Sequence, residues 1–273
     1  MRSRRPRRNR RHPSPSPRRE RRRSRRRETP RNDLGLGRPG GYGHHPHHRR
    51  RLPRGLHSVS ETTHILGLIL AGGLARRFGG DEVQAVDKAR LVLAGRPLLA
   101  HVRERLASQV STLTLSANGD PDRYRDTGLP VLADSVPGYP GPLAGVLVGL
   151  EYAGTQGGHT HVLSVPADCP FLPLDLAARL AGAAAPDGVA CATSGGRRHP
   201  VVALWPVSLA DRLRQALVGE DLRKVGAFLA RQPLALVDFP VQPVDPFFNV
   251  NTPADLDAAA AFLSKGLAPP IQA

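Results

Sequence analysis

An apolar segment followed directly by a glycine-rich, basic segment constrains this chain more than any other feature. Residues 64–70 read His-Ile-Leu-Gly-Leu-Ile-Leu, and residues 71–80 read Ala-Gly-Gly-Leu-Ala-Arg-Arg-Phe-Gly-Gly. An uncharged apolar run of this length predicts a buried strand of a parallel sheet. Glycines after such a strand let backbone N–H groups approach phosphate oxygens, and Lys88 adds a mobile positive charge. The apolar segment and the glycine-rich loop together predict an α/β domain that binds phosphates.

The spacing of this loop differs from that of two common phosphate-binding motifs. The motif G-x-x-x-x-G-K-[ST] requires Ser or Thr after the lysine, whereas Ala89 follows Lys88. The glycines also do not form a clean G-x-G-x-x-G, which opens dinucleotide-binding helices. The loop therefore fits neither of these two nucleotide-binding classes.

Charge divides the chain into two parts. Residues 1–60 hold 21 Arg, no Lys and three acidic residues, a net charge of +18, whereas the remainder has 18 basic and 20 acidic residues. The first segment has few large apolar residues, so it cannot bury enough surface to offset its ordering entropy. We predict a disordered Arg-rich tail over residues 1–60 and one domain over residues 61–273. An arginine-rich arm can also bind nucleic acid, so a nucleic-acid-binding protein remains a second function class.

Further sequence features concern export, membrane contact and disulfide formation. The apolar run at residues 65–71 is short and is needed as the first strand, so we interpret it as core rather than as an export signal. No stretch approaches the roughly 18 apolar residues of a membrane span. Cys169 and Cys191 are the only cysteines and do not make a disulfide framework. We expect a cytoplasmic protein without membrane contact, and non-specific nucleic-acid binding at most through the tail.

Strand-like and helix-like patterns alternate along the domain. The expected strands are residues 64–70, 112–117, 130–133, 161–166, 189–193, 200–205 and 235–239; the expected helices are residues 97–106, 143–153, 174–183, 208–218 and 253–264. This alternation predicts a three-layer α/β domain with a mostly parallel sheet. Ligands of such sheets bind at the carboxyl ends of the strands.

Asp168 is the best candidate metal ligand. It lies in Pro-Ala-Asp-Cys-Pro at residues 166–170, at the end of an expected strand. A carboxylate in a loop stiffened by prolines suits Mg²⁺, although an isolated aspartate there could also be a turn or helix-capping residue. With no evident Ser-His-Asp or Cys-His set, transfer between phosphates fits the chain better than attack by a protein nucleophile.

Further polar segments occur downstream. Asn118, in Leu-Ser-Ala-Asn, can donate and accept hydrogen bonds, which suits a base or ribose edge, although Asn-Gly is also a turn signal. Residues 141–145 read Gly-Pro-Leu-Ala-Gly, residues 198–200 read Arg-His-Pro, and residues 249–253 read Asn-Val-Asn-Thr-Pro. Thr252 before Pro253 predicts the cap of the last helix.

Taken together, these segments resemble the signature of the molybdenum cofactor guanylyltransferases, which join GMP to molybdopterin. Their glycine loop reads roughly L-A-G-G-x-x-x-R-M-G-G-x-D-K. This chain matches it at Leu70, Ala71, Gly72, Gly73, Arg77, Gly79, Gly80, Asp87 and Lys88. It departs at Phe78, where Met is usual, and carries extra residues at 81–86. With the downstream segments, the resemblance covers about residues 62–265.

The resemblance implies roles for individual residues. The implied nucleotide contacts are Leu70, Ala71, Gly72, Gly73, Lys88, Asn118, Asp134 and Asp168. Lys88 would act on the phosphates with help from Arg77, and Asp168 would hold Mg²⁺. The implied acceptor-side residues are Arg198, His199, Asn249 and Asn251. The alternatives are a surface Lys88, a solvated Arg77 and a structural His199.

The resemblance also implies a reaction: Mg²⁺-dependent transfer of GMP from GTP to molybdopterin, with release of pyrophosphate. It implies a single three-layer nucleotidyltransferase domain with a Rossmann-like sheet, and transient contact with proteins that carry or insert the molybdenum cofactor. Transfer from CTP to molybdopterin, or from a nucleotide to a sugar phosphate, remains an alternative within the same fold. A ligand-binding domain without catalysis is another, since fold alone does not imply chemistry.

Overall fold

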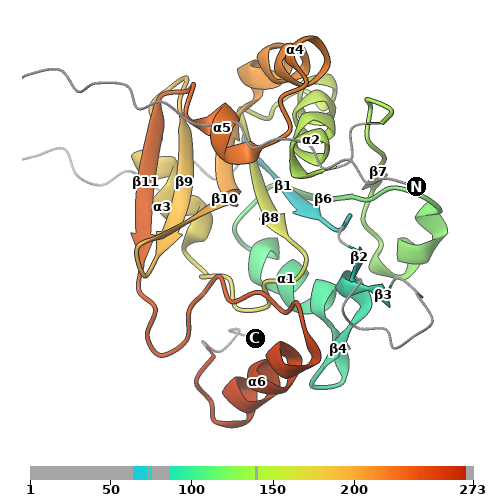
Figure 1. Cartoon of the computed structure of the whole chain (residues 1–273), viewed down its shortest axis with the longest axis vertical. Helices are drawn as coiled ribbons and strands as arrows, with labels where there is room; N and C mark the ends of the chain where they lie inside the picture. Colours follow the sequence, from blue (N-terminus) through green and yellow to red (C-terminus); the bar gives the residue numbers. More distant parts are fainter. Residues whose placement is uncertain (1–63, 73, 76–85, 139–140, 269–273) are drawn as a thin grey trace, which may run out of the picture. The chain divides into compact units, whose positions relative to one another are not determined.

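Seven strands form one sheet in the order β11-β9-β10-β8-β1-β6-β7 in the computed structural model, which describes residues 64–72, 74–75, 86–138 and 141–268 (Figure 1). The strands are β1 (Ile65–Leu70), β6 (Thr112–Ser116), β7 (Val131–Leu132), β8 (His161–Pro166), β9 (Val189–Ser194), β10 (Arg197–Pro206) and β11 (Leu234–Phe239). Within this sheet β10 runs antiparallel to β8 and β9, and the other neighbours are parallel. The expected mostly parallel sheet is confirmed.

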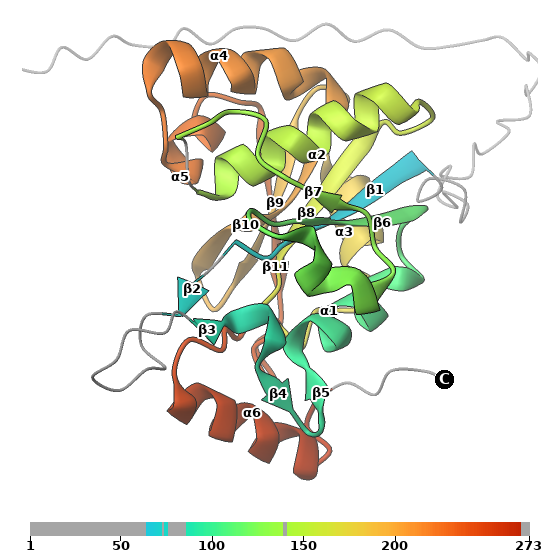
Figure 2. The ribbon, with the colours of Figure 1, turned by 90° about the vertical axis from the view of Figure 1, so that its right-hand side faces the viewer.

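Helices cover both faces of the sheet. On one face lie α1 (Leu98–Ala107) and α3 (Leu176–Ala183), and on the other lie α2 (Pro142–Gln156), α4 (Ala210–Glu220) and α5 (Val225–Leu229). Figure 2 shows α2 and α4 on one side of the sheet and α1 on the other. Each face has its own buried apolar cluster, which confirms the expected three layers.

Short elements lie mainly between β1 and α1, with one 3₁₀ turn between β6 and β7 and another between β10 and α4. Two hairpins are formed by β2 (Leu74–Ala75) with β3 (Val86–Asp87) and by β4 (Val92–Leu93) with β5 (Arg96–Pro97); the 3₁₀ turns are η2 (Lys88–Arg90), η3 (Pro121–Thr127) and η4 (Val207–Leu209). The last helix, α6 (Pro253–Ser264), belongs to a third apolar cluster that contains Leu93.

Two glycines of α2 bring this helix close to the sheet. A Cβ atom on Gly149 would lie 2.5 Å from Leu68, and one on Gly145 would lie 2.7 Å from both Leu70 and Ser116. Real Cβ atoms do not tolerate such distances, so larger residues would push the helix outward. The first turn of α2 therefore lies against the carboxyl ends of β1 and β6.

The observed sheet strands and longer helices follow the expected pattern, whereas α5, the two short hairpins and the turns η2 and η3 were not predicted. Two of the expected elements also differ in detail. The expected strand at residues 200–205 begins earlier, at Arg197, and is antiparallel, because Gly195 and Gly196 form a turn with positive φ angles of 53° and 75°. The expected helix at residues 208–218 begins with η4 before it continues as α4.

The predicted disordered tail at residues 1–60 lies outside the described residues. In the part of the chain that the structure describes, none of the helices combines the length and apolar character needed to cross a bilayer.

Candidate active site

A cavity of about 270 Å³ opens at the carboxyl ends of β1, β6 and β8. Its lining residues come from strand ends, from the start of α2 and from two loops: Leu70, Ala71, Gly72, Lys88, Ala89, Ser116, Ala117, Asn118, Asp134, Gly141, Pro142, Gly145, Pro166, Ala167, Asp168, Val201 and Asn249. Parallel α/β sheets place their ligand sites at this edge. The cavity lies at the edge of the sheet where the strand-end motifs predicted a site.

Backbone hydrogen bonds hold the strand ends around this cavity. The amide of Ala71 donates to the carbonyl of Ser116 (2.9 Å), and the amide of Ala167 donates to the carbonyl of Leu70 (3.0 Å). The register of the central strands therefore continues for one residue into the loops after β1 and β8. As a result, the glycine loop and the loop that carries Asp168 begin side by side.

Lys88 and Asp168 form an ion pair at the wall of the cavity. Lys88 Nζ lies 3.5 Å from Asp168 Oδ2, and the two side chains are 18% and 14% exposed. Lys88 Nζ also donates to Asn251 Oδ1, and Asn249 Nδ2 donates to Asp168 Oδ1 at 3.3 Å. The structure therefore places Asn249 and Asn251, both expected on the acceptor side, in direct contact with the two main catalytic candidates.

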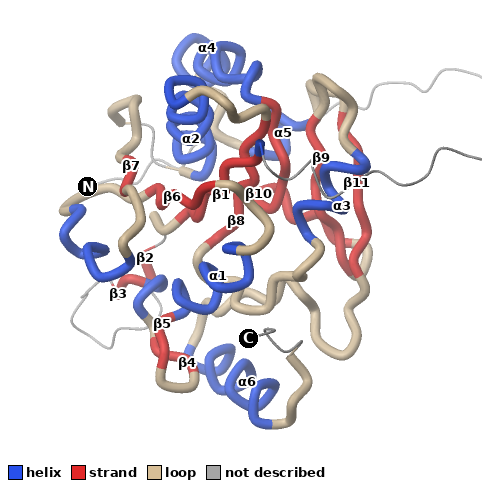
Figure 3. Tube along the Cα trace, turned by 180° about the vertical axis from the view of Figure 1, so that it is seen from behind, coloured by secondary structure: helices blue, strands red, loops and turns tan. Residues whose placement is uncertain are grey.

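The loop before α6 brings these asparagines to the strand ends. This connection from β11 to α6 contains no helix or strand, and Figure 3 shows it as a long tan segment. The amide of Val250 donates to the carbonyl of Asp168 (2.9 Å). The Asp255 carboxylate accepts from the amides of Asn251 (2.9 Å) and Thr252 (2.8 Å), and Thr252 Oγ1 accepts from the amide of Asp255 (3.2 Å).

This arrangement is a capping box, and it confirms Thr252 as the helix cap. The cap uses only the backbone amide of Asn251. The Asn251 side chain is therefore available to Lys88, whose Nζ donates to Asn251 Oδ1. The two asparagines of the segment therefore contact Lys88 and Asp168, whereas the threonine caps the helix.

Burial shifts the pKa values of two neighbouring residues at this wall, Asp168 and Cys169. Burial raises the pKa of Asp168, while the nearby positive charge of Lys88 acts in the opposite direction. Burial also raises the pKa of Cys169 well above its usual value. The protonated Cys169 thiol donates to Asn249 Oδ1 (3.0 Å). Cys169 thus orients an amide rather than acting as a nucleophile, which needs the thiolate.

The opposite wall carries a second polar pair. Asn118 Nδ2 donates to Asp134 Oδ2 at 2.7 Å, and Asn118 Oδ1 accepts from the amide of Asp134 at 2.9 Å. The two bonds tie the loop after β6 to the loop after β7. Asn118 is exposed toward the cavity edge, so it combines the expected turn chemistry with a position that a ligand can reach.

The donor set suits a metal that is shared with a ligand. Among the described residues there is no group of three or more His, Cys, Asp or Glu side chains that could hold a metal ion by itself. Mg²⁺ commonly binds through one or two carboxylates and completes its coordination with substrate phosphates and water. The Asp168 carboxylate, which lies beside Lys88 at the cavity wall, fits that kind of site.

Comparison with known proteins decides the family. A family model described as "MobA-like NTP transferase domain" matches residues 67–234. A molybdenum cofactor guanylyltransferase from Bradyrhizobium sp. (strain ORS 278) is 55% identical over 203 residues, which covers 73% of this chain and 93% of the relative. The chain belongs to the molybdenum cofactor guanylyltransferase family.

Two further comparisons agree with this membership. The guanylyltransferase of Rhodopseudomonas palustris (strain HaA2) is 53% identical over 208 residues, 75% of this chain and 95% of the relative. The crystal structure of molybdopterin-guanine dinucleotide biosynthesis protein A from Archaeoglobus fulgidus has a TM-score of 0.58 and covers 73% of this chain and 99% of that protein. At 22% identity, this second likeness concerns the fold.

The site brings together most of the residues implied by the family resemblance. Leu70, Ala71, Gly72, Lys88, Asn118, Asp134, Asp168 and Asn249 all line the cavity. Gly73 and Arg77 lie outside the described residues, as do Phe78, Gly79, Gly80 and residues 81–85. The part that Arg77 plays in catalysis therefore stays a prediction.

Arg198 and His199 are not among the residues that line the cavity. Arg198 is exposed at the start of β10, whereas the His199 ring packs on Phe247 with ring centroids 4.6 Å apart. His199 Nε2 lies 2.8 Å from Ser194 Oγ, which itself donates to Asp245 Oδ1 (2.9 Å). These contacts favour a structural role for His199, in which it joins the β9–β10 turn to the loop before α6.

Several lining residues carry no chemical signal in the sequence. Ser116, Ala117 and Val201 line the cavity, yet each is a small or apolar residue at a strand position. The available signal was positional, since the residues that end parallel strands face the ligand edge of the sheet. That signal would have identified Ser116, which ends β6, and Ala117, which lies between Ser116 and Asn118.

Proposed function

We propose that this protein transfers GMP from GTP to the terminal phosphate of molybdopterin and releases pyrophosphate. The observation that carries the proposal is the cavity in which Lys88 and Asp168 lie against Gly72 and the strand ends. The names of the close relatives support guanine as the base and the molybdenum cofactor as the acceptor. They do not favour transfer to a sugar phosphate, transfer from CTP, or a nucleic-acid-binding function.

The two walls of the cavity suit the two ends of a nucleotide. The backbone after β1, from Leu70 to Gly72, would approach the triphosphate closely because glycine lacks a side chain. Asn118 and Asp134 offer both donors and acceptors, which suits the edges of the base and ribose. GTP would then lie along the carboxyl ends of β1 and β6.

The reaction needs an electrostatic site rather than a protein base. An ionised oxygen of the molybdopterin phosphate attacks the α-phosphorus of GTP, and the bond from that phosphorus to the β-phosphate oxygen breaks. The electron pair leaves with pyrophosphate, so no proton has to be removed from the nucleophile. Lys88 Nζ would leave Asp168 for the phosphates and stabilise the charge that develops there.

Asp168 would hold the Mg²⁺ that the family resemblance implies. When bound, the metal would neutralise charge on the nucleotide phosphates. Asn249, which donates to Asp168 Oδ1, would keep the carboxylate oriented, and the buried Cys169 would in turn orient Asn249. These contacts restrict the orientation of the Asp168 carboxylate, on which metal binding would depend.

The acceptor would enter from the side of the loop before α6. Asn249 and Asn251 lie beside Asp168 and Lys88, and the exposed Arg198 offers a positive charge for a phosphate. A cytoplasmic location and transient contact with molybdenum cofactor carrier or insertion proteins complete the proposal.

Nucleotide binding provides a direct test of base preference. In the presence of Mg²⁺, GTP at 100 times its Kd should stabilise the full-length protein by about 2.7 kcal/mol through mass action, and its Tm should rise accordingly. CTP, ATP and UTP at the same concentration should raise it much less. An equal or larger shift with CTP would contradict the assignment of guanine.

A further inference from the structure

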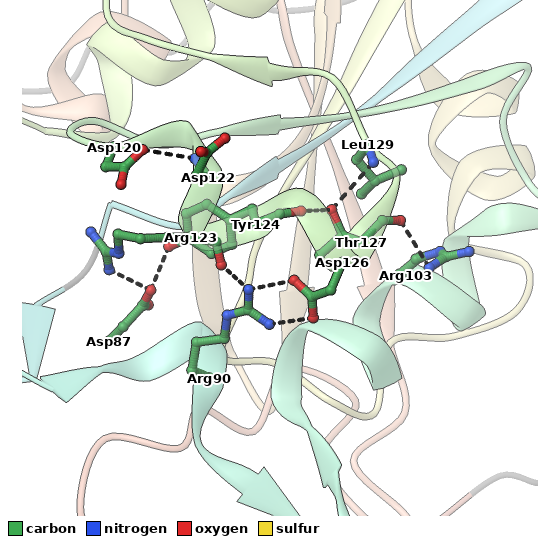
Figure 4. A network of polar contacts seen from close by, with 10 residues as sticks. All are labelled: Asp87, Arg90, Arg103, Asp120, Asp122, Arg123, Tyr124, Asp126, Thr127 and Leu129. Carbon is green, nitrogen blue, oxygen red and sulfur yellow. Dashed lines mark hydrogen bonds and ion pairs between the residues drawn. The ribbon is translucent and has the colours of Figure 1, made fainter.

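A network of polar contacts holds the turn that carries Lys88. Asp87, which precedes Lys88 and caps η2, and Arg90, which ends η2, both contact residues of η3, as Figure 4 shows. Asp87 Oδ1 caps η2 by accepting from the amide of Ala89 (3.1 Å). Asp87 Oδ2 accepts from the Tyr124 hydroxyl (2.6 Å) and from Arg123 Nη2 (2.6 Å).

Arg90 makes the second link between the two turns. Its guanidinium donates to both carboxylate oxygens of Asp126, at 2.6 Å through Nη1, and also to the carbonyl of Arg123. Both Arg90 and Arg123 place their guanidinium carbons over the Tyr124 ring, at 5.3 Å and 5.5 Å from its centroid. Tyr124 is therefore at the centre of the network.

Burial decides which of these contacts matters most. The Arg90 and Asp126 side chains are 31% and 64% exposed, and exposed ion pairs contribute little to stability. Asp87 is 12% exposed, and Tyr124 is 1% exposed within the apolar core. A hydrogen bond from a buried hydroxyl to a carboxylate is stronger than a neutral one, so the contact between Tyr124 and Asp87 outweighs the exposed pair of Arg90 and Asp126.

The same segment also connects the two walls of the cavity. Asn118 lines the cavity, and Asp120 two residues later caps η3 by accepting from the amide of Asp122 (2.9 Å). Tyr124 then reaches back to Asp87, the neighbour of Lys88. One short stretch of chain thus carries a residue of the nucleotide side and the anchor of the phosphate side.

We propose that Tyr124 is a positioning residue for guanylyl transfer, which orients Lys88 through the hydrogen bond from its hydroxyl to Asp87. This inference rests on the proposed function and on the role of Lys88 within it. Lys88 Nζ contacts Asp168 and Asn251, and the position of the Lys88 backbone sets where Nζ can lie. Tyr124 would fix that backbone through Asp87 without contacting substrate.

A double-mutant cycle in the full-length protein tests the proposal. Tyr124→Phe removes the hydroxyl and keeps the ring, and it should lower kcat by about tenfold with little change in the KM for GTP. In a Lys88→Ala background, the same substitution should lower kcat no further, because the group that it positions is gone. Tyr152→Phe, on a partly buried tyrosine of α2, is the matched control and should keep the wild-type kcat.

The cycle separates positioning from a general loss of structure. If Tyr124→Phe lowers kcat by the same factor with and without Lys88, or leaves kcat unchanged in the wild-type background, the positioning role is wrong. Arg123→Gln repeats the cycle through the other contact of Asp87 Oδ2, at a side chain that is 41% exposed, should Tyr124→Phe melt below the assay temperature.

Failure of the proposed function would look different. A wild-type protein that makes no guanylylated product refutes the function itself, and a Lys88→Ala variant with wild-type kcat refutes the role of Lys88. Either result also removes the basis for Tyr124. An active wild type, an impaired Lys88→Ala variant and a fully active Tyr124→Phe variant refute the positioning proposal alone.

Discussion

Replacing Asp168 with alanine is expected to lower kcat for GMP transfer by roughly a thousandfold or more. Asp168 is the only carboxylate in contact with Lys88 among the described residues, and its side chain is 14% exposed at the cavity wall. Its removal takes away the anchor proposed for the metal, which would neutralise charge on the phosphates. Steady-state rates of pyrophosphate release at saturating GTP and Mg²⁺ measure the effect.

The fold should survive this substitution. Asp168 contributes its backbone carbonyl to the bond with Val250, and that bond does not depend on the side chain. Asp175→Asn is a suitable control, because Asp175 is 61% exposed and pairs with Arg179 on the surface at 3.9 Å. Near wild-type turnover of a folded Asp168→Ala protein would show that the metal assignment is wrong.

Replacing Lys88 with alanine is expected to lower kcat by about 10²–10³, as the loss of one electrostatic stabiliser typically does. Lys88 Nζ lies 3.5 Å from Asp168 and donates to Asn251, so the extra residues before it have not moved it away from the site. Because the charge should matter most when negative charge develops on the phosphates, kcat should fall more than the KM for GTP rises.

The control for Lys88 is a lysine with the same charge and no place in the cavity. Lys265, exposed beyond the end of α6, serves this purpose, and Lys265→Ala should keep the wild-type rate. Unchanged kinetics in Lys88→Ala would show that Lys88 does not act on the phosphates, and Arg77, the other cation of the glycine loop, would then be the next candidate. The pair of variants thus distinguishes a specific role from a change in net charge.

Local patterns predicted the central strands and the two strand-end motifs. The uncharged run before the glycine loop became β1, and Pro-Ala-Asp-Cys-Pro became the turn after β8. The bounds expected for the last helix, Pro253–Ser264, were confirmed because Thr252 and Pro253 are strong start signals. Such features depend on neighbours in the sequence, so sequence patterns suffice for them.

Contacts between distant segments could not be predicted in this way. Asn249 meets Asp168 across 81 positions of the chain, and only the fold brings the loop before α6 to β8. Tyr124 lies in a polar stretch, Asp-Arg-Tyr-Arg-Asp, that resembles a solvated turn, yet its ring is 1% exposed. An apolar pattern also carries no strand direction, so the antiparallel β10 depended on recognising the Gly195–Gly196 turn.

The proposed function is that this cavity joins GMP to molybdopterin. It is tested most sharply by the mass of the product that the full-length protein forms from GTP, molybdopterin and Mg²⁺, together with the pyrophosphate released. We expect a molybdopterin-guanine dinucleotide in equal amount to pyrophosphate, with much less product when CTP replaces GTP. A cytosine dinucleotide as the main product, or GTP consumed without any dinucleotide, would contradict it.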